Sequence, residues 1–370
     1  MTLSHEEFRA LFPALTSHTW FDTPGAPPAA EPVASAVRSA LDDWTAGRAD
    51  WLQWDAVPQQ VRTLIAAAHR VPATSVALLT SVSEAAATVS AAHPTGAALV
   101  LDSEYRSVRF PFMQRREVLS VPVGADRTTT LIEALHPGVS LVAFSEILSS
   151  DGERVDVRLV CEAAHAVGAR VFVDATQSFG VLDTDHVAAG ADYVAVHGYK
   201  WMLCPRGAAW LVATDHSGLA PLAPGWKSTP RPHGYFGGEL ELGPGITGLD
   251  SSPAWLSWIG AQAALDVHLR LDIPAVHEHV TALRETLATH ASELGYTVIP
   301  SRLPSHLAVI ESDRDTTLPE MLAQHAIKAT ATPTRLRIGL HYFNNQLDID
   351  KLVGLLKDAR SGPPIHQNTR

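Results

Sequence analysis

Three side chains between residues 174 and 200 are of the types that can hold an aromatic ring and attach it to the protein. Asp174 ends a short run of β-branched and aromatic residues, Gln177 follows three positions later, and Lys200 follows the next such run. At the carboxyl ends of strands in an α/β sheet, side chains face a ligand crevice. A fixed carboxylate keeps a pyridine nitrogen protonated so that the ring accepts electrons, and a lysine amine can bond to the same ring.

Each of these residues also has a simpler interpretation. An aspartate at a strand end often caps the next helix, and a lone lysine is usually a solvated surface residue. Asp174 and Lys200 are 26 positions apart, which leaves room for one helix and one strand. With Gln177 between them, the acid and the amine together favour a pyridoxal phosphate site over either simpler interpretation.

Two motifs that contain these residues, and a third that follows Lys200, resemble the class V aminotransferase family of fold-type I pyridoxal phosphate enzymes. The family patterns Asp-x-x-Gln, Ser-x-His-Lys and Gly-Pro-x-Gly correspond to Asp174-Ala-Thr-Gln177, His197-Gly-Tyr-Lys200 and Cys204-Pro-Arg-Gly207. Two positions depart from the pattern. His197 stands where many members have a phosphate-binding serine, and Tyr199 before the lysine is similar to kynureninase. Other branches of the family are cysteine desulfurases, isopenicillin N epimerase-like proteins and carbon-sulfur lyases.

The composition indicates a globular protein that acts on small molecules. The 370 residues are 46% hydrophobic, and the formal net charge is -11. This acidic balance, with no basic block, argues against nucleic acid or an anionic membrane surface as a partner. No apolar run approaches transmembrane length, and the polar N-terminal segment lacks a secretory signal, so we expect a cytoplasmic protein. The two cysteines, Cys161 and Cys204, indicate neither a disulfide framework nor a metal site.

Apolar runs that alternate with amphipathic stretches predict an α/β sheet that is mostly parallel and covered by helices. The expected strands are 76–79, 98–101, 140–144, 170–173, 193–196 and 208–212, and 157–166 is an expected helix closed by Gly168. The resemblance implies the fold-type I architecture, with a mixed, mostly parallel seven-stranded sheet in a large domain over 21–250. Residues 1–20 and 251–370 are expected to form a smaller α+β domain, with a long helix near 276–287 and strands near 307–310 and 335–340.

The segment Thr80-Ser-Val-Ser-Glu84 predicts a helix start that can bind an anion. Ser81 and Glu84 have the spacing of a capping box, and a helix start offers free N–H groups. Most such boxes only cap a helix. Here the segment matches the Gly-Thr-Thr-Glu segment of the family. The resemblance therefore implies that the cofactor phosphate is held by Ser81, Val82, Ser83, His197 and Tyr199.

The resemblance also implies which residues contact the cofactor ring. The family's Phe-x-Ser arrangement maps onto Tyr105-Arg-Ser107, which places Tyr105 over the ring; a shift of one position places Arg106 there instead. An aromatic side chain packed under a loop is an equally good interpretation of Tyr105. Ser149 replaces an asparagine that contacts the phenolic oxygen in many relatives, and Gln177 keeps the second contact to that oxygen.

Near the C-terminus, the segment 335–344 resembles the family's Arg-x-Ser-x-x-x-Tyr-Asn segment. The match assigns the substrate α-carboxylate to Arg337, whose planar fork can pair bidentately with a carboxylate. Alternatively, Arg335 and Arg337 are only the polar face of an edge strand. The segment 21–28 resembles the family's substrate entrance and makes Thr23 and Gly25 candidate substrate contacts; a proline-rich connector is the alternative.

The resemblance implies a pyridoxal phosphate enzyme that acts on an amino acid, as a homodimer in which Leu249 and Asp250 reach the neighbour's phosphate. We expect Lys200 to be the catalytic base and the reaction to be β-elimination from an S-substituted cysteine in secondary metabolism, as in carbon-sulfur lyases. A cysteine desulfurase is disfavoured because residues 213–370 contain no cysteine. The alternatives are a decarboxylating or oxidative-deaminating enzyme, an epimerase, an aminotransferase, or a catalytically silent cofactor-binding protein.

Overall fold

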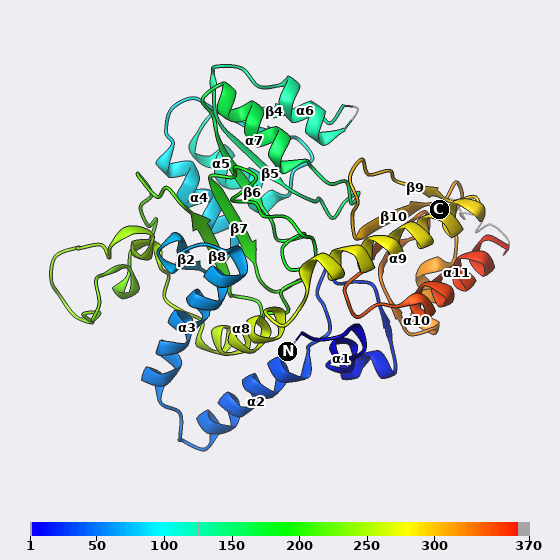
Figure 1. Ribbon diagram of the computed structural model, residues 1–370, viewed down its shortest axis with the longest axis horizontal. Helices are drawn as coiled ribbons and strands as arrows, with labels where there is room; N and C mark the ends of the chain where they lie inside the picture. Colours follow the sequence, from blue (N-terminus) through cyan, green and yellow to red (C-terminus); the bar gives the residue numbers. More distant parts are fainter. Residues whose placement is uncertain (1, 125, 362–370) are drawn as a thin grey trace, which may run out of the picture.

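A seven-stranded sheet lies at the centre of the larger part of the molecule (Figure 1). The computed structural model describes residues 2–124 and 126–361. The strand order is β2-β8-β7-β6-β5-β3-β4; β8 is antiparallel to both of its neighbours and the remaining pairs are parallel. This arrangement confirms the predicted fold class. The strands are β2 (Val76–Leu79), β3 (Ala97–Leu101), β4 (Val118–Val121), β5 (Val139–Ser145), β6 (Arg170–Asp174), β7 (Tyr193–His197) and β8 (Ala209–Ala213).

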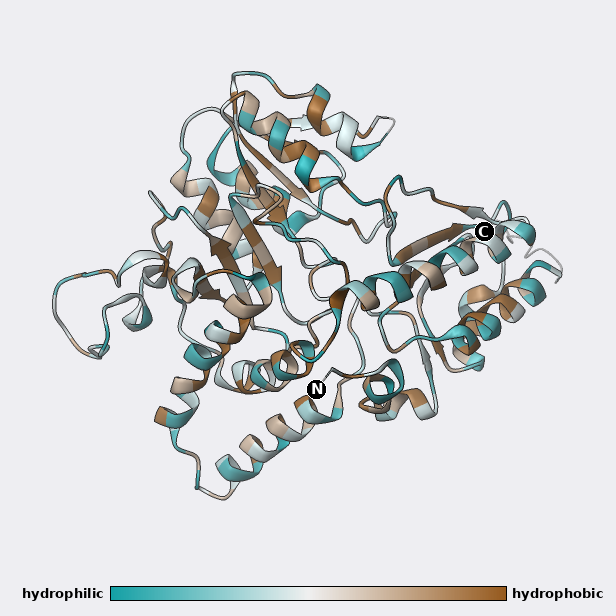
Figure 2. Cartoon of the chain, viewed as in Figure 1, coloured by the Kyte–Doolittle hydropathy of each residue, from teal (hydrophilic) through white to brown (hydrophobic). Residues whose placement is uncertain are grey.

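Alternate residues of the central strands pack against different layers of helices. In β6, Val171 and Val173 belong to one apolar cluster, whereas Phe172 belongs to the cluster on the opposite face. Both faces of the sheet are therefore covered, and the strands read as continuous hydrophobic runs (Figure 2). The helices of this part are α2 (Glu31–Thr45), α3 (Trp51–His69), α4 (Val82–Ala92), α5 (Arg106–Arg115), α6 (Arg127–Glu133), α7 (Val157–Ala166) and α8 (Trp255–His268).

A second, smaller layer structure forms the other end of the molecule. Its antiparallel sheet has the order β12-β13-β10-β9, and helices pack on one side of it. Antiparallel strands with segregated helices make this an α+β unit, as predicted. Its elements are α9 (Ile273–Glu293), β9 (Thr297–Val298), β10 (Leu307–Glu311), α10 (Leu318–Gln324), β11 (Ile327–Lys328), β12 (Thr330–Thr332), β13 (Arg335–Gly339) and α11 (Gln346–Ser361).

The N-terminal segment contacts both units. Phe8 and Phe12 belong to the core of the large sheet, whereas Phe21 belongs to the core of the small unit. Helix α8 packs on α2 and α3 beside the large sheet, although it follows residue 250. The predicted boundary at residue 250 between the large and the small domain stays a prediction. The remaining elements are α1 (His5–Ala10), β1 (Thr19–Trp20), and the 3-10 helices η1 (Pro13–Thr16), η2 (Ala73–Ser75), η3 (Trp226–Ser228) and η4 (Gly245–Leu249).

Candidate active site

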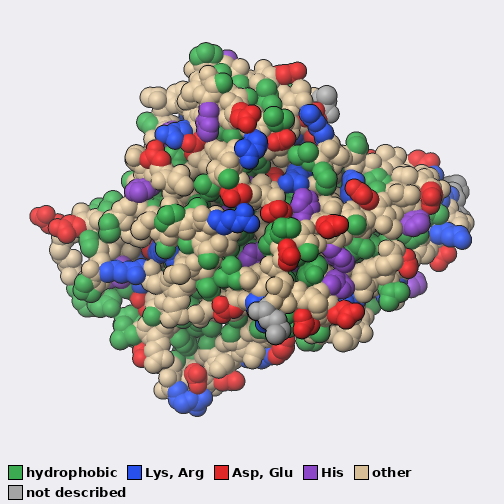
Figure 3. Space-filling model, in the orientation of Figure 1, with side chains coloured by type: hydrophobic (Ala, Val, Ile, Leu, Met, Phe, Trp, Pro, Cys, Tyr) green, Lys and Arg blue, Asp and Glu red, His purple; other side chains and the backbone are tan. Residues whose placement is uncertain are grey.

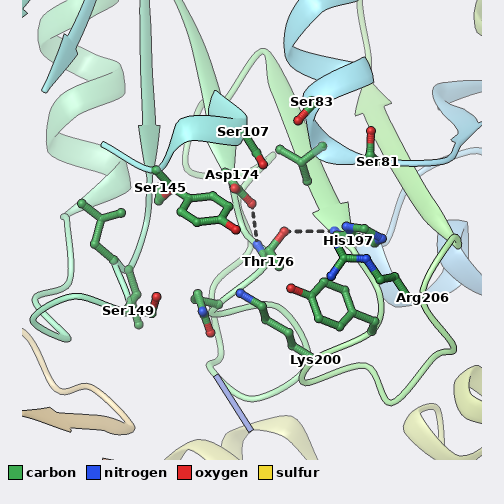
Figure 4. Close-up of a pocket in the computed structure, with 16 residues that line it drawn as sticks. Ser81, Ser83, Ser107, Ser145, Ser149, Asp174, Thr176, His197, Lys200 and Arg206 are labelled. Carbon is green, nitrogen blue, oxygen red and sulfur yellow. Dashed lines mark hydrogen bonds between the residues drawn. The ribbon is translucent and has the colours of Figure 1, made fainter. Parts of the chain in front are cut away.

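A cavity of about 110 Å³ opens at the carboxyl ends of the parallel strands β3, β5, β6 and β7 (Figure 4). The first turn of α4 forms one wall, and the loop after β7 forms another. The sheet therefore brings together segments that are far apart in the sequence. The cavity is lined by Ser81, Val82, Ser83, Tyr105, Ser107, Ser145, Ile147, Leu148, Ser149, Asp174, Thr176, Gln177, His197, Tyr199, Lys200 and Arg206.

Asp174 is the buried acid of the cavity. It ends β6, and its carboxylate accepts a hydrogen bond of 2.9 Å from the backbone N–H of Thr176. Burial raises the pKa of this carboxyl, while hydrogen bonding from Thr176 and the charge of Lys200 act in the opposite direction. An anion in this position is stabilised by any cationic ring nitrogen placed beside it.

Lys200 follows β7 and reaches into the same cavity. Burial lowers its pKa to about 8, and the positive charges of Arg337 and Arg206 act in the same direction, against Asp174 and Asp22. Its Nζ lies 5.8 Å from the centre of the Tyr105 ring and 5.5 Å from that of Tyr199. A lysine with this pKa is partly unprotonated near neutral pH, which is the form that acts as a nucleophile or base.

The first turn of α4 offers hydrogen-bond donors at one end of the cavity. Ser81 is the N-cap residue, and its Oγ accepts a hydrogen bond of 3.2 Å from the N–H of Glu84. The Glu84 carboxylate accepts from the N–H and the hydroxyl of Thr80, at 2.9 and 2.8 Å, and not from the N–H of Ser81 as in a complete capping box. The N–H groups of Val82 and Ser83 have no partner within the helix, so they are available to an anion.

His197 lies between this helix start and Lys200. Its backbone N–H donates to Thr176 Oγ1 at 3.0 Å, and its Nε2 accepts a long hydrogen bond of 3.5 Å from the N–H of Gly207. Burial, together with the neighbouring charges of Arg206 and Lys200, lowers the pKa of His197 to about 4. The imidazole is therefore neutral at physiological pH and offers hydrogen bonding without charge.

Tyr105, and not Arg106, lines the cavity. Arg106 is the first residue of α5, and its guanidinium lies 5.6 Å from the centre of the Phe110 ring, outside the cavity. Glu104 fixes the backbone before Tyr105. Its buried carboxylate accepts from the N–H of Tyr105 at 2.6 Å and from the N–H and hydroxyl of Ser145 at 2.9 and 2.7 Å. The clamp joins the ends of β3 and β5.

Gln177 and Ser149 complete the lining on the side of the small unit. The amide of Gln177 donates to the carbonyl oxygen of Pro24 at 3.3 Å and accepts from the indole N–H of Trp201 at 2.8 Å. The Gln177 amide therefore connects the N-terminal segment to the loop that carries Lys200. Ser149 lies at the opposite end of the cavity from Ser81 (Figure 4).

The predicted substrate residues lie beyond the cavity lining. The Arg337 guanidinium donates to Asp22 Oδ1 at 3.1 Å and to Thr330 Oγ1 at 2.8 Å, while its buried Nε has no partner among the residues that the structure describes. The buried hydroxyl of Thr23 also lacks a partner, and a Cβ at Gly25 would lie 2.8 Å from Asp22 Oδ2. The Arg337 Nε and the Thr23 hydroxyl therefore have hydrogen-bonding capacity that no described residue uses. Arg337 is close enough to Lys200 for its charge to lower the pKa of that lysine.

Leu249 and Asp250 lie at the end of η4, away from the cavity. The Asp250 carboxylate forms a buried ion pair with Arg62 and accepts a hydrogen bond of 3.0 Å from the N–H of Leu78. Its predicted contact with a second subunit stays a prediction, as do the binding roles of the other site residues.

Several cavity residues were not predicted from the sequence: Ser107, Ser145, Ile147, Leu148, Thr176 and Arg206. Thr176 and Arg206 lie inside the motifs that carry the family resemblance, so the sequence could have indicated that they lie at the site. Glu104 was also missed as a backbone clamp. Its partner Ser145 is 41 positions away, and no local pattern indicates that contact.

Among the described residues, no group of three or more His, Cys, Asp or Glu side chains is arranged to hold a metal ion. In the same part of the chain, no helix is both long and apolar enough to cross a membrane.

Known proteins share both the sequence pattern and the architecture. Residues 54–310 match the family model described as Aminotransferase class-V. The uncharacterized aminotransferase YcbU of Bacillus subtilis is 23% identical over 98% of this chain and 99% of its own length. Isopenicillin N epimerase of Streptomyces clavuligerus is 27% identical over 70% of this chain and 68% of its own length.

The fold is that of solved structures with low sequence identity. The apo cysteine desulfurase of Thermococcus onnurineus superposes with a TM-score of 0.84 over 98% of this chain and all of its own, at 16% identity. The cystine C-S lyase C-DES, solved with its reaction product cysteine persulfide, gives a TM-score of 0.83 over 95% of this chain and all of its own, at 21% identity.

Proposed function

The chain belongs to the aminotransferase class V family. We propose that it is a pyridoxal phosphate enzyme that cleaves the carbon-sulfur bond of an S-substituted cysteine by β-elimination. The expected products are pyruvate, ammonia and a thiol or persulfide. The proposal includes a role in the metabolism of sulfur-bearing secondary metabolites, in the cytoplasm.

The cavity fits the cofactor on three separate grounds. Asp174 is a buried carboxyl whose raised pKa means that burial disfavours its charged form. A protonated pyridine nitrogen beside it would stabilise that charged form. Lys200 supplies an amine, and the start of α4 supplies free N–H groups for a phosphate. Pyridoxal phosphate, when bound, supplies an electron sink for the electrons released at the substrate Cα.

The residues of the chain then have distinct tasks. Lys200 would hold the cofactor through Nζ, and the same amine, when free, would accept the proton from the substrate Cα. Its pKa of about 8 suits both steps near neutral pH. Asp174 would hold the protonated ring nitrogen through its carboxylate, and Arg337 would orient the substrate through the α-carboxylate.

One observation carries the choice of β-elimination: the chain has no cysteine that can receive sulfur. It contains only Cys161 and Cys204. Both are buried, and burial raises the pKa of each thiol to about 12. A desulfurase needs an accessible thiolate as sulfur acceptor. β-Elimination needs none, because the sulfur leaves with its own substituent. The cysteine persulfide that is the reaction product of the structurally similar C-DES is such a species.

Epimerisation is the second candidate, because isopenicillin N epimerase is among the more similar sequences. The same anchors would serve it, since Cα deprotonation is its first step as well. The two reactions differ in their products, because only elimination releases sulfur and pyruvate.

A substrate panel tests the proposal. Purified protein reconstituted with pyridoxal phosphate would be incubated with cystine, S-alkyl cysteines and S-aryl cysteines, with products identified by mass spectrometry. We expect pyruvate and a thiol or persulfide, and no product from the Lys200→Ala variant. A racemised amino acid without sulfur release would favour the epimerase, and carbon dioxide would indicate decarboxylation; either result would refute elimination.

We further propose that the enzyme is a homodimer. Apolar residues on the flank formed by α2, α3 and the 214–250 segment are exposed, including Trp44 at 61% and Phe236 at 97% (Figures 1 and 3). Trp51, Trp54 and Trp255 line a shallow apolar hollow beside them. Exposed apolar surface of this extent is typical of an interface.

Sedimentation velocity tests the dimer. We expect the wild-type chain to sediment as a dimer and the Phe236→Glu variant to dissociate at micromolar concentration. Leu347→Glu is the matched control, because Leu347 is equally apolar and 74% exposed but lies on α11, away from this flank. A monomeric wild-type protein, or equal effects of the two substitutions, would contradict the proposed interface.

A further inference from the structure

The cavity contains a cation, Arg206, that the proposed chemistry does not use. Lys200 and Arg206 are the only lysine or arginine residues in its lining. Lys200 is committed to the ring and to proton transfer. No carboxylate within the described part of the chain forms an ion pair with Arg206. A cation in a ligand cavity without an anionic partner from the protein indicates an anionic ligand group.

Arg206 lies at the end of the cavity where an anion is expected. Its guanidinium carbon is 4.8 Å from the centre of the Tyr199 ring. Figure 4 places it beside His197, on the side of Ser81 and away from Ser149. The charge of Arg206 lowers the pKa values of both His197 and Lys200. Arg206 therefore lies close to the group of donors formed by the first turn of α4 and His197.

The other donors at this end supply hydrogen bonds but no full positive charge. Ser83 and the helix N–H groups are neutral, and His197 is uncharged at physiological pH. A phosphate monoester carries close to two negative charges at this pH. Arginine is the side chain best suited to it, because its planar fork donates bidentately and can also stack on an aromatic ring.

The backbone around Arg206 is held in place before any ligand arrives. The carbonyl oxygen of Arg206 accepts a hydrogen bond of 2.8 Å from Ser257 Oγ of α8, and the N–H of Cys204 donates to the carbonyl oxygen of Gly198 at 3.0 Å. Pro205 packs so closely on Gly260 of α8 that a Cβ at Gly260 would clash with the proline ring. Because the loop is fixed at both of its flanks, little conformational entropy is lost at Arg206 when a ligand binds.

We infer that Arg206 is the cationic residue that binds the cofactor phosphate, stacked on Tyr199 and supported by the donors of α4. The inference rests on the proposed function, because it assigns a residue to the cofactor of that same site. It assigns the positive charge that faces the phosphate to the loop after Lys200, since α4 contains no lysine or arginine.

Binding of the cofactor with and without its phosphate tests the inference directly. Apoprotein would be titrated with pyridoxal 5'-phosphate and with pyridoxal, following the visible absorbance of the lysine-bound ring. We expect Arg206→Gln to raise the dissociation constant for pyridoxal phosphate by roughly tenfold to a hundredfold, and that for pyridoxal by less than about twofold. Arg206→Lys should lie between wild type and Arg206→Gln, since it keeps the charge and loses the fork.

The control is Arg335→Gln, an exposed arginine outside the cavity, which should leave both constants unchanged. Inorganic phosphate should compete with pyridoxal phosphate for wild-type apoprotein and compete less well in Arg206→Gln. Unchanged affinity of Arg206→Gln for pyridoxal phosphate, or equal losses for the two ligands, would overturn the inference. If wild-type apoprotein binds neither ligand, the cofactor proposal itself fails, which is a distinguishable result.

Discussion

At the scale of single residues, Asp174 and Lys200 are shifted away from their usual ionisation in opposite directions. Burial is the main cause for both, because it disfavours the charged form of each group. A ring with a cationic nitrogen would stabilise the Asp174 carboxylate, and an aldehyde on the same ring would react with the neutral Lys200 amine. The folded protein therefore already bears the unfavourable burial of these two ionisable groups before a ligand binds.

Asp174→Asn should lower turnover by roughly a hundredfold or more, because an amide cannot hold the ring nitrogen in its protonated state. The fold should not suffer, since the substitution removes a buried carboxyl whose burial is unfavourable. Steady-state kcat and the thermal midpoint, measured on the same preparations, test both statements. Turnover close to wild type would refute the assigned role.

Arg337→Lys should weaken amino-acid binding although the charge is retained, because an ammonium cannot reproduce the bidentate fork. Arg337→Ala should raise the apparent dissociation constant of the substrate by roughly two orders of magnitude. Arg335→Ala is the matched control, as Arg335 lies on the same strand but contacts Ser150 and Glu311. Titration of the substrate-induced spectral change compares the three variants; a larger loss in Arg335→Ala would move the carboxylate site to that residue.

Local motifs were sufficient to predict that Asp174, Lys200 and the start of α4 lie around one cavity, since each ends or begins an element with a recognisable pattern. They were insufficient for the contacts of Glu104 and for the direction of the Arg206 side chain, although Arg206 itself lies within a motif. The Glu104 clamp depends on the pairing of β3 with β5, and the use of Arg206 depends on which way its loop faces. Both are consequences of tertiary structure, which short-range spacing does not encode.

At the scale of elements, a buried ion pair between Arg62 and Asp250 joins α3 to the end of η4 beneath β2. Arg62 also donates to the carbonyl oxygen of Val76, and Asp250 accepts from the N–H of Leu78. Both side chains are almost fully buried. The pair therefore fixes the segment that leads from the 214–250 region back into α8.

Arg62→Ala should lower the free energy of unfolding by about 3 to 5 kcal/mol, because it leaves Asp250 charged, buried and without its partner. The control is Arg38→Ala, which removes an ion pair with Glu31 on the exposed face of α2 and should cost less than about 1 kcal/mol. Urea denaturation followed by circular dichroism measures both. Equal losses would mean that the buried pair contributes no more than an exposed one.

The strands of the large sheet were predictable because each is a buried run of β-branched and aliphatic residues between polar segments. β4 was missed as a specific strand, since Val118–Val121 lies at the sheet edge and is only half buried. The short strands β1, β11 and β12 were also missed. Each has two or three residues, so its pattern is too short to show a period. β1 and β11 form only because these two distant segments pair with each other, whereas β12 pairs with the adjacent β13.

At the scale of the whole molecule, histidines buried in both units make stability depend on pH. Burial lowers the pKa of His268 to about 4 and that of His341 to about 3, and it lowers those of His69 and His306 well below the usual value. The unfolded chain binds these protons near pH 6.5, and the folded chain does so only at lower pH. Stability is therefore lost as the pH falls from about 6.5 towards about 4. The buried carboxyls Glu104 and Asp174, whose pKa values are raised, oppose part of this loss.

His268→Gln should flatten this acid limb, because glutamine does not titrate. Between pH 7 and pH 5 the variant should lose about 2 kcal/mol less of its unfolding free energy than the wild type does. His325→Gln, at an exposed histidine of the small unit, should leave the slope unchanged. Urea denaturation at a series of pH values gives the slopes. An unchanged slope in His268→Gln would show that this histidine does not contribute.

The pairing of the N-terminal segment with the small unit sets the order in which a newly made chain can finish folding. Thr19 and Trp20 of β1 pair with β11, and the carbonyl oxygen of Phe21 accepts from the N–H of Gly339. These partners are synthesised about three hundred residues later, so the segment leaves the ribosome long before its partners exist. Contacts so distant in sequence form late in folding. The wall that carries Asp22 and Thr23 is therefore completed only after translation has passed residue 339. A nascent chain that has already formed its large sheet still lacks this wall of the predicted substrate entrance.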